Sequence, residues 1–174
     1  HRIYGWDFVG TDIDSTAIHY AEMNIGNNAH MKKHIQVRLQ EDPKKIFQGI
    51  VNKGEKFDVV VCNPPFCKSR EENWKSSTKK FQNLHKSKDK ITVQNFGGHP
   101  NELWCEGGER AFVRNMIYES MNFKSQLGWV SSLIADKENI KPLVAVLEYN
   151  KAAAVKIIPM AQGNKISRIL AWKW

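Results

Sequence analysis

The sequence predicts an α/β fold whose mostly parallel sheet carries helices on both faces and ends in one antiparallel hairpin. Three observations support this prediction. Short apolar runs alternate along the chain with segments of helical periodicity. The valine-rich run from Phe57 to Cys62 stops abruptly at two prolines. Residues 154–174 contain two strand-like runs around Gly163 and Asn164. With 174 residues and 41% hydrophobic content, a single domain is expected.

The N-terminal part of the chain predicts a strand, a helix and a second strand. Residues 9–12 end a first strand that is expected to begin near Trp6. Asp14 or Ser15 is the expected N-cap of a helix that stops at Gly26. Apolar residues alternate over residues 35–39, which predicts the second strand. Together these elements indicate a parallel strand–helix–strand unit.

A second helix is expected before the valine-rich strand. Asp42 is a candidate N-cap, Pro43 suits the first helical position, and Gly54 follows the last apolar residue. The strand at residues 57–62 is expected to be buried on both faces, because it is almost continuously apolar. The C-terminal part predicts, in order, a helix over residues 112–121, a strand over 128–135, a helix opening at Pro142, and the hairpin.

The tetrapeptide Asn63-Pro64-Pro65-Phe66 places an amide and an aromatic ring at the end of a strand. In open α/β sheets, ligands bind beyond the carboxyl ends of the strands. The Asn63 side-chain oxygen and the Pro64 carbonyl could each accept one N–H of a conjugated amine, which frees its lone pair toward an electrophilic methyl group. Phe66 could stack on the base. Two prolines also mark ordinary turns, so the alternative is that Asn63 only caps a turn.

The net charge of +8 is unevenly distributed. Residues 68–90 contain eight Lys or Arg against three acidic residues and few periodic apolar ones. We therefore expect a long basic loop over residues 68–100 that contacts the phosphates of a nucleic acid. A solvated loop without a partner is the alternative.

Composition excludes several classes. No apolar run is long enough for a membrane span. The three cysteines have no metal-ligand spacing and fit a reduced, cytoplasmic protein. The six histidines are scattered singly, so no metal site is expected.

Asp12 ends the first predicted strand, where an acid can accept hydrogen bonds from the ribose of a nucleotide cofactor. The glycine-rich turn that normally lies about 20 residues earlier has no counterpart in this sequence. We therefore expect an N-terminally truncated domain that lacks its first strand, this turn and the first helix, and that is inactive alone. The alternative for Asp12 is an acid favoured by a helix dipole.

Four segments resemble one family: Asn63 to Phe66, Asn95 to Gly98, Glu102 to Glu109 and Met160 to Gly163. They resemble the bacterial 23S ribosomal RNA adenine-N6 methyltransferases (RlmF) and, more distantly, the animal U6 small-nuclear RNA adenine methyltransferases. The resemblance covers essentially the whole chain.

This resemblance implies a Rossmann-like class I methyltransferase with S-adenosyl-L-methionine as its cofactor. The implied substrate is 23S ribosomal RNA, with adenine 1618 as the family target. By the same resemblance, Asn63 to Phe66 hold the adenine, and Asn63, Asp12 and Ile13 contact the cofactor.

Two further segments are candidate substrate contacts. Gly107 and Gly108 let the backbone approach a ligand at the start of a helix, and Glu109 could accept from a base or cap that helix. The alternative is a glycine turn that only allows packing. In the hairpin, the candidate RNA contacts are Gln162, Lys165 and Arg168, and the alternative is an ordinary polar turn.

Other functions remain open on the sequence alone. A methyltransferase of this type could act on DNA adenine or protein glutamine, although the basic loop favours a nucleic acid. A non-catalytic RNA-binding module with the same fold is the second alternative.

Overall fold

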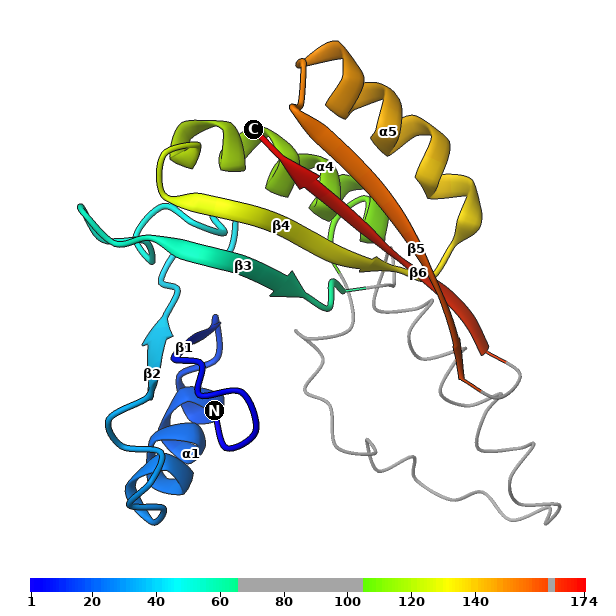
Figure 1. Cartoon of the computed structure of the whole chain (residues 1–174). Helices are drawn as coiled ribbons and strands as arrows, with labels where there is room; N and C mark the ends of the chain where they lie inside the picture. Colours follow the sequence, from blue (N-terminus) through cyan, green and yellow to red (C-terminus); the bar gives the residue numbers. More distant parts are fainter. Residues whose placement is uncertain (66–104, 163–164) are drawn as a thin grey trace, which may run out of the picture. The chain divides into compact units, whose positions relative to one another are not determined.

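The computed structural model describes residues 1–65, 105–162 and 165–174. The chain divides into two compact units, His1–Glu55 (unit 1) and Lys56–Trp174 (unit 2). Each unit has its own sheet (Figure 1): a two-stranded sheet of order β1-β2 and a four-stranded sheet of order β3-β4-β6-β5. Among the described residues, no helix is long and apolar enough to cross a membrane.

Unit 1 contains the strand–helix–strand arrangement that the sequence predicts. Its elements are β1 (Phe8–Asp12), α1 (Ser15–Gly26) and β2 (Ile35–Leu39). The strands are parallel and run in register from Phe8 opposite Ile35 to Asp12 opposite Leu39. Asp14 is the N-cap of α1, because its side chain accepts the Thr16 backbone N–H at 2.7 Å. The three predicted elements and the Asp14 cap are confirmed, although β1 begins at Phe8 and not near Trp6.

The prediction of a helix between Asp42 and Gly54 is wrong, because residues 40–56 form a series of turns. Gly49, inside the predicted helix, has a φ of +87°, which a right-handed helix cannot accommodate. Phe47 and Ile50 are nevertheless buried. The apolar residues that suggested a helical face are therefore buried by a folded turn.

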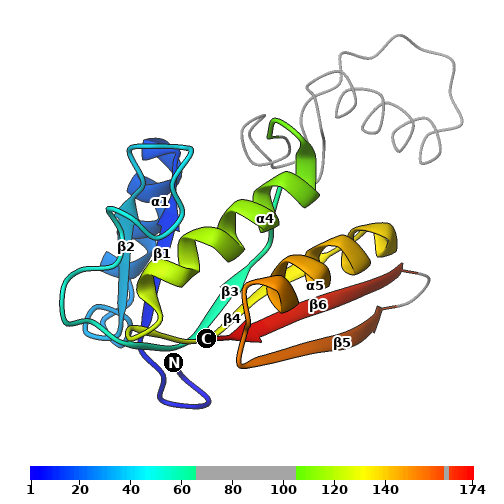
Figure 2. The same ribbon diagram turned by 90° about the horizontal axis from the view of Figure 1, so that it is seen from above.

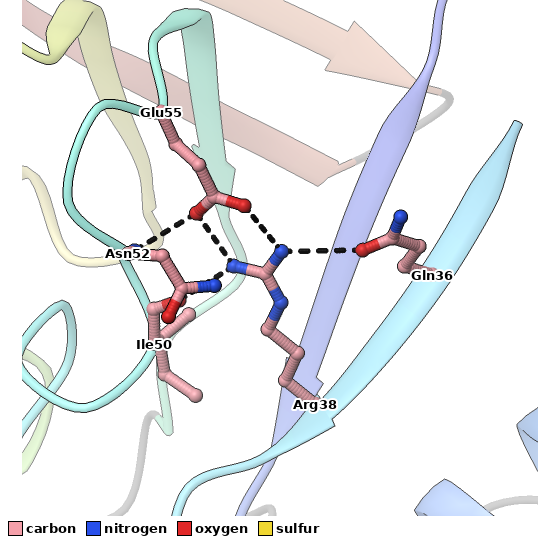
Figure 3. A network of polar contacts seen from close by, with 5 residues as sticks. All are labelled: Gln36, Arg38, Ile50, Asn52 and Glu55. Atoms are coloured by element: carbon pink, nitrogen blue, oxygen red, sulfur yellow. Dashed lines mark hydrogen bonds and ion pairs between the residues drawn. The ribbon is translucent and has the colours of Figure 1, made fainter.

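Arg38, on β2, holds this turn segment in place (Figure 3). Its guanidinium donates to both carboxylate oxygens of Glu55, at 2.6 and 2.8 Å, and to the Ile50 carbonyl at 2.6 Å. Glu55 in turn accepts the Asn52 backbone N–H at 2.8 Å. Hydrogen bonds from Arg38 and from Asn52 lower the pKa of Glu55 to about 2. The segment thus gains from side chains part of the hydrogen bonding that a helix would have supplied.

Unit 2 is a mixed sheet with the predicted hairpin at one side. Its strands are β3 (Phe57–Cys62), β4 (Leu127–Ile134), β5 (Ala154–Gln162) and β6 (Lys165–Lys173). The pair β3–β4 is parallel, whereas β6 is antiparallel to both β4 and β5. Its helices are α4 (Gly108–Ser120) and α5 (Ile140–Tyr149), which contact each other (Figure 2). The short helix η1 (Met121–Phe123) follows α4, and the short helix η2 (Lys137–Asn139) precedes α5.

The core of unit 2 joins α4 to the end of the hairpin. Trp172 is fully buried, and its indole N–H donates to the Ser120 hydroxyl at 3.1 Å. Trp174 donates to the same hydroxyl at 2.8 Å, while Ser120 donates to the Ile117 carbonyl at 2.7 Å. One hydroxyl therefore satisfies two indole donors, and the C-terminal tryptophans pack as structural residues.

Strand β3 is present as predicted, but it is not buried on both faces. Val59 is 50% exposed and Val61 is 81% exposed. Among the described residues, β3 pairs only with β4 and β1 pairs only with β2. Within the described residues, each unit therefore has two strands with an unpaired edge, β1 and β2 in unit 1 and β3 and β5 in unit 2.

Candidate functional site

The carboxyl end of β3 is where the structure places the predicted amide. Cys62 pairs with Ser132 on the parallel strand β4, so both strands end at the same edge of the sheet. Asn63 follows directly and is exposed, whereas Pro64 is fully buried and Pro65 is partly buried. The buried Pro64 fixes the backbone on which the exposed Asn63 amide is carried. Phe66 lies outside the described residues.

Helix α4 begins at this same edge, because Glu109 in its first turn bonds to residues just beyond β4. Gly107 and Gly108 precede or open the helix with φ of +77° and +64°. A Cβ on Gly107 would lie 2.5 Å from the Cβ of Ala111. Position 107 requires glycine because its φ is positive and because a side chain would collide with Ala111. This agrees with the alternative in which the glycine turn serves packing. Contact with a ligand stays a prediction.

Glu109 is only 4% exposed, and the described part of the chain supplies donors to both of its carboxylate oxygens. Oε1 accepts the Ala135 backbone N–H at 2.6 Å. Oε2 accepts the Asn139 side-chain amide at 2.7 Å and the Asp136 backbone N–H at 3.3 Å. The expected contact between Glu109 and a substrate also stays a prediction.

The hairpin of β5 and β6 extends past the end of β4 (Figure 1). Arg168 on β6 is paired with Ile134, the last residue of β4. Beyond Arg168 the ladder continues for three pairs, the last of which is Gln162 with Lys165. Three strand residues span about 10 Å. The backbone of these three predicted contact residues therefore lies at, or beyond, the edge that carries Asn63.

Cys62 precedes Asn63, and its thiol is not available as a nucleophile at neutral pH. Burial raises the pKa of Cys62 to about 11, and a hydrogen bond with Ser132 acts in the opposite direction. The thiol is therefore protonated and weakly nucleophilic. Chemistry at this edge is expected to rely on hydrogen bonding and position rather than on covalent catalysis.

Asp12 lies at the carboxyl end of β1 in unit 1. Its Oδ1 accepts the Asp14 backbone N–H at 2.9 Å, and its other oxygen has no partner among residues 1–65, 105–162 and 165–174. Asp12 is partly buried and the next residue, Ile13, is 42% exposed. This carboxylate therefore retains an oxygen with which to accept a hydroxyl hydrogen bond.

Three residues far apart in the sequence form a cluster that sequence reasoning missed. His1, Asp7 and His34 bring possible metal-ligand atoms within 4.8 Å of one another. The two imidazoles are stacked, with centroids 3.6 Å apart and planes inclined by 14°. The in-plane lone pairs of stacked rings lie in two separate, nearly parallel planes, so they do not converge on one ion. Moreover, the Nδ1 atoms already bond to the Trp6 carbonyl and to the Asp7 carboxylate. A hydrogen-bonded histidine pair accounts for the cluster.

Several predicted segments lie outside the described residues: the basic loop over residues 68–100, Asn95 to Gly98, and the start of the segment from Glu102 to Glu109. The side chains of Gln162 and Lys165 are also not described. The partners of Glu109 could not have been predicted, because Ala135 and Asn139 carry no sequence signal for this contact.

Comparison with known proteins decides the family. A family model described as RNA methyltransferase matches residues 1–174. The chain belongs to this RNA methyltransferase family. Among curated relatives, the ribosomal RNA large subunit methyltransferase F of Christiangramia forsetii is 47% identical over 173 residues, covering 99% of this chain and 60% of the relative. The protein of the same name from Shewanella loihica is 45% identical, covering 99% of this chain and 45% of the relative.

Solved structures confirm a class I methyltransferase fold. The hMettl16 catalytic domain in complex with the MAT2A 3'UTR hairpin 1 matches with a TM-score of 0.78 and 26% identity, covering 98% of this chain and 56% of that one. The N-terminal domain of human METTL16 in complex with SAH matches with a TM-score of 0.69 and 24% identity, covering 98% and 53%. This member of the RNA methyltransferase family thus spans about half the length of the proteins that it matches.

Proposed function

We propose that this chain belongs to an enzyme that transfers a methyl group from S-adenosyl-L-methionine to the N6 amine of an adenine in 23S ribosomal RNA. The observation that carries the proposal is the exposed Asn63 amide on a backbone fixed by buried Pro64, at the carboxyl edge of β3. Family membership over the whole chain makes methyl transfer to RNA the chemistry that suits this edge.

The proposed role of Asn63 follows from the weak nucleophilicity of an adenine amine. Its lone pair is delocalised into the ring. When the Asn63 side-chain oxygen and the Pro64 carbonyl each accept one N–H, the nitrogen pyramidalises and its lone pair is freed. S-adenosyl-L-methionine, when bound, would supply the methyl group to this lone pair with its thioether as the leaving group, and the proton of the amine would pass to water. Preorganised acceptors of this kind need no rearrangement during the reaction. In this proposal Pro65 stiffens the turn and Phe66 stacks on the adenine.

S-adenosyl-L-methionine would supply the electrophilic methyl group. Asp12 fits its ribose, because one carboxylate oxygen has no partner within the described residues and lies at the end of a parallel strand. Ile13 and Asn63 are the other residues proposed to contact this cofactor.

The RNA contacts are proposed for the sheet edge around Asn63. Arg168 lies two strands from β3, which corresponds to about 10 Å across the sheet. Gln162 and Lys165 follow at the hairpin end, and Gly107 and Gly108 lie at the start of α4. The net charge of +8 favours a polyanionic partner. The names of the curated relatives support ribosomal RNA, and the hMettl16 complex supports binding of an RNA hairpin.

Replacement of Asn63 tests the proposal in the full-length protein. Asn63→Ala removes the side-chain acceptor and is expected to lower kcat for methylation of 23S ribosomal RNA by at least about a hundredfold, as loss of a preorganised charge-stabilising donor or acceptor does in other enzymes. Affinity for S-adenosyl-L-methionine, measured by calorimetry, is expected to stay nearly unchanged.

The matched control is Asn122→Ala, because Asn122 is an exposed asparagine in η1. It should methylate at the wild-type rate. Equal turnover of Asn63→Ala and wild type would refute the role of Asn63. A full-length protein that binds RNA but transfers no methyl group to it would instead identify a non-catalytic binding module, and transfer to DNA or protein only would identify another acceptor.

A further inference from the structure

We infer that Glu109 is a positioning residue, which fixes the loop after β4 beside the Asn63 edge and thereby holds the acceptor geometry of the proposed reaction. This inference rests on the proposed function. It assigns Glu109 a role through the residues that it holds, in place of a direct contact with RNA.

The first step is the local geometry. Glu109 is the second residue of α4, and its carboxylate reaches out of the helix to residues that follow β4. It accepts from the backbone at Ala135 and Asp136 and from the Asn139 side chain, at 2.6, 3.3 and 2.7 Å. A carboxylate has acceptors only, so three donors converging on two oxygens suit its ionised form. Because Glu109 is almost fully buried, water cannot replace these bonds if they are lost.

The second step connects these bonds to Asn63. Strands β3 and β4 are parallel neighbours, and Cys62 lies opposite Ser132. The loops that leave the two strands are therefore adjacent at one edge. Glu109 ties one of these loops to the start of α4, where Gly107 has no room for a side chain. Movement of the loop at Ala135 would therefore change the surroundings of Asn63 at this edge, although Asn63 itself is unaltered.

The third step is why an amide cannot substitute. In Glu109→Gln, one oxygen becomes an NH2 group, which in either orientation faces a backbone N–H, that of Ala135 or that of Asp136, whereas the Asn139 amide can rotate to present its oxygen. Two donors then oppose each other in a buried site. Asn139→Asp offers a matched compensation, because it returns a carboxylate to this cluster, and both of its oxygens can accept from the new NH2 group.

The experiment uses the full-length protein in wild-type form and as Glu109→Gln, the double variant Glu109→Gln/Asn139→Asp, and the control Glu148→Gln. Glu148 is an exposed acid on α5. Glu109→Gln is expected to lower kcat at least about tenfold with less than about a twofold change in KM for RNA, since position affects the transition state more than ground-state binding. The double variant should recover most of kcat, and Glu148→Gln should match wild type.

Amide hydrogen exchange supplies a readout that does not depend on activity. The Ala135 and Asp136 amides should exchange at least about tenfold faster in Glu109→Gln than in wild type, because their acceptor is weakened. Unchanged exchange at both amides, or a kcat within about twofold of wild type, would overturn the inference. A wild-type protein without methyltransferase activity would refute the proposed function, while faster exchange would still establish the contact. If Glu109→Gln does not fold, Asn139→Ala removes a single one of the three bonds and serves for the same measurements.

Discussion

Arg38 and Glu55 show how one ion pair can replace the hydrogen bonding of a missing helix. Their bidentate contact joins β2 to the end of the turn segment, and both side chains are partly buried (Figure 3). Bidentate pairs between arginine and a carboxylate are stronger and more directional than single contacts. The Ile50 carbonyl shares the same guanidinium, so the pair also orients the turn.

This pair predicts a defined pH dependence of stability. The pKa of Glu55 falls from an ordinary value of 4.5 to about 2 in the folded chain. The stabilising contribution is therefore fully present above pH 4.5 and is lost as the pH falls through about 2. We expect Tm to fall more steeply between pH 4.5 and 2.5 in wild type than in Glu55→Gln. Thermal unfolding followed by circular dichroism measures this difference.

The control for this measurement is Glu41→Gln, because Glu41 is an exposed acid in the same segment. It should keep the wild-type slope. Identical slopes for wild type and Glu55→Gln would show that the pair does not stabilise the ionised carboxylate.

At the scale of single residues, the sequence predicts groups whose neighbours along the chain define them. Asn63 was predictable because the strand before it and the prolines after it are local signals. The Asp14 cap was predictable for the same reason. The partners of Glu109 were not, since Asn139 is 30 positions away and its contact depends on how α4 packs against the end of β4.

Among the elements, the approach of β3 to β4 depends on Gly128. A Cβ at this position would lie 2.3 Å from the carbonyl oxygen of Asp58 on the neighbouring strand. That oxygen belongs to the backbone and cannot move without displacing β3. Gly128→Ala is therefore expected to reduce the free energy of unfolding by at least about 2 kcal/mol, within the range for overpacking. Urea denaturation measures the loss.

Gly26→Ala is the matched control, because nothing lies within 4 Å of a Cβ at the end of α1. It should change stability by less than about 1 kcal/mol. Equal effects of the two substitutions would mean that β3 and β4 separate easily. The pairing of β3 with β4 would then not hold Asn63 in a fixed position.

Element types were predictable wherever periodicity and breakers agreed. The β5–β6 hairpin follows from alternation around Gly163 and Asn164, and α4 follows from its apolar spacing. The helix that was wrongly predicted after β2 shows where prediction from periodicity fails. Apolar spacing and a good N-cap were present there, but the positive φ at Gly49 and the long-range bond from Arg38 to Ile50 favour a turn. Neither is visible in a local pattern.

For the molecule as a whole, each unit carries part of what the proposed reaction needs. Unit 1 provides Asp12, and unit 2 provides Asn63. Within the described residues, β1 and β3 each have a partner on one side only. Sequence reasoning expected a single domain over residues 1–174. It could not predict the division into two compact units, which depends on contacts over the whole chain.

The last prediction concerns cofactor binding by the 174-residue chain. Its sequence contains no glycine-x-glycine turn, so the backbone amides that such a turn would direct at the cofactor are missing from residues 1–174. Asp12 then supplies a single acidic contact, which does not offset the entropy lost on binding. We expect the chain to bind S-adenosyl-L-methionine at least about a hundredfold more weakly than the full-length relative of Christiangramia forsetii, or not at all. Calorimetry on both proteins measures the ratio, and comparable affinities would show that the glycine turn is dispensable for binding.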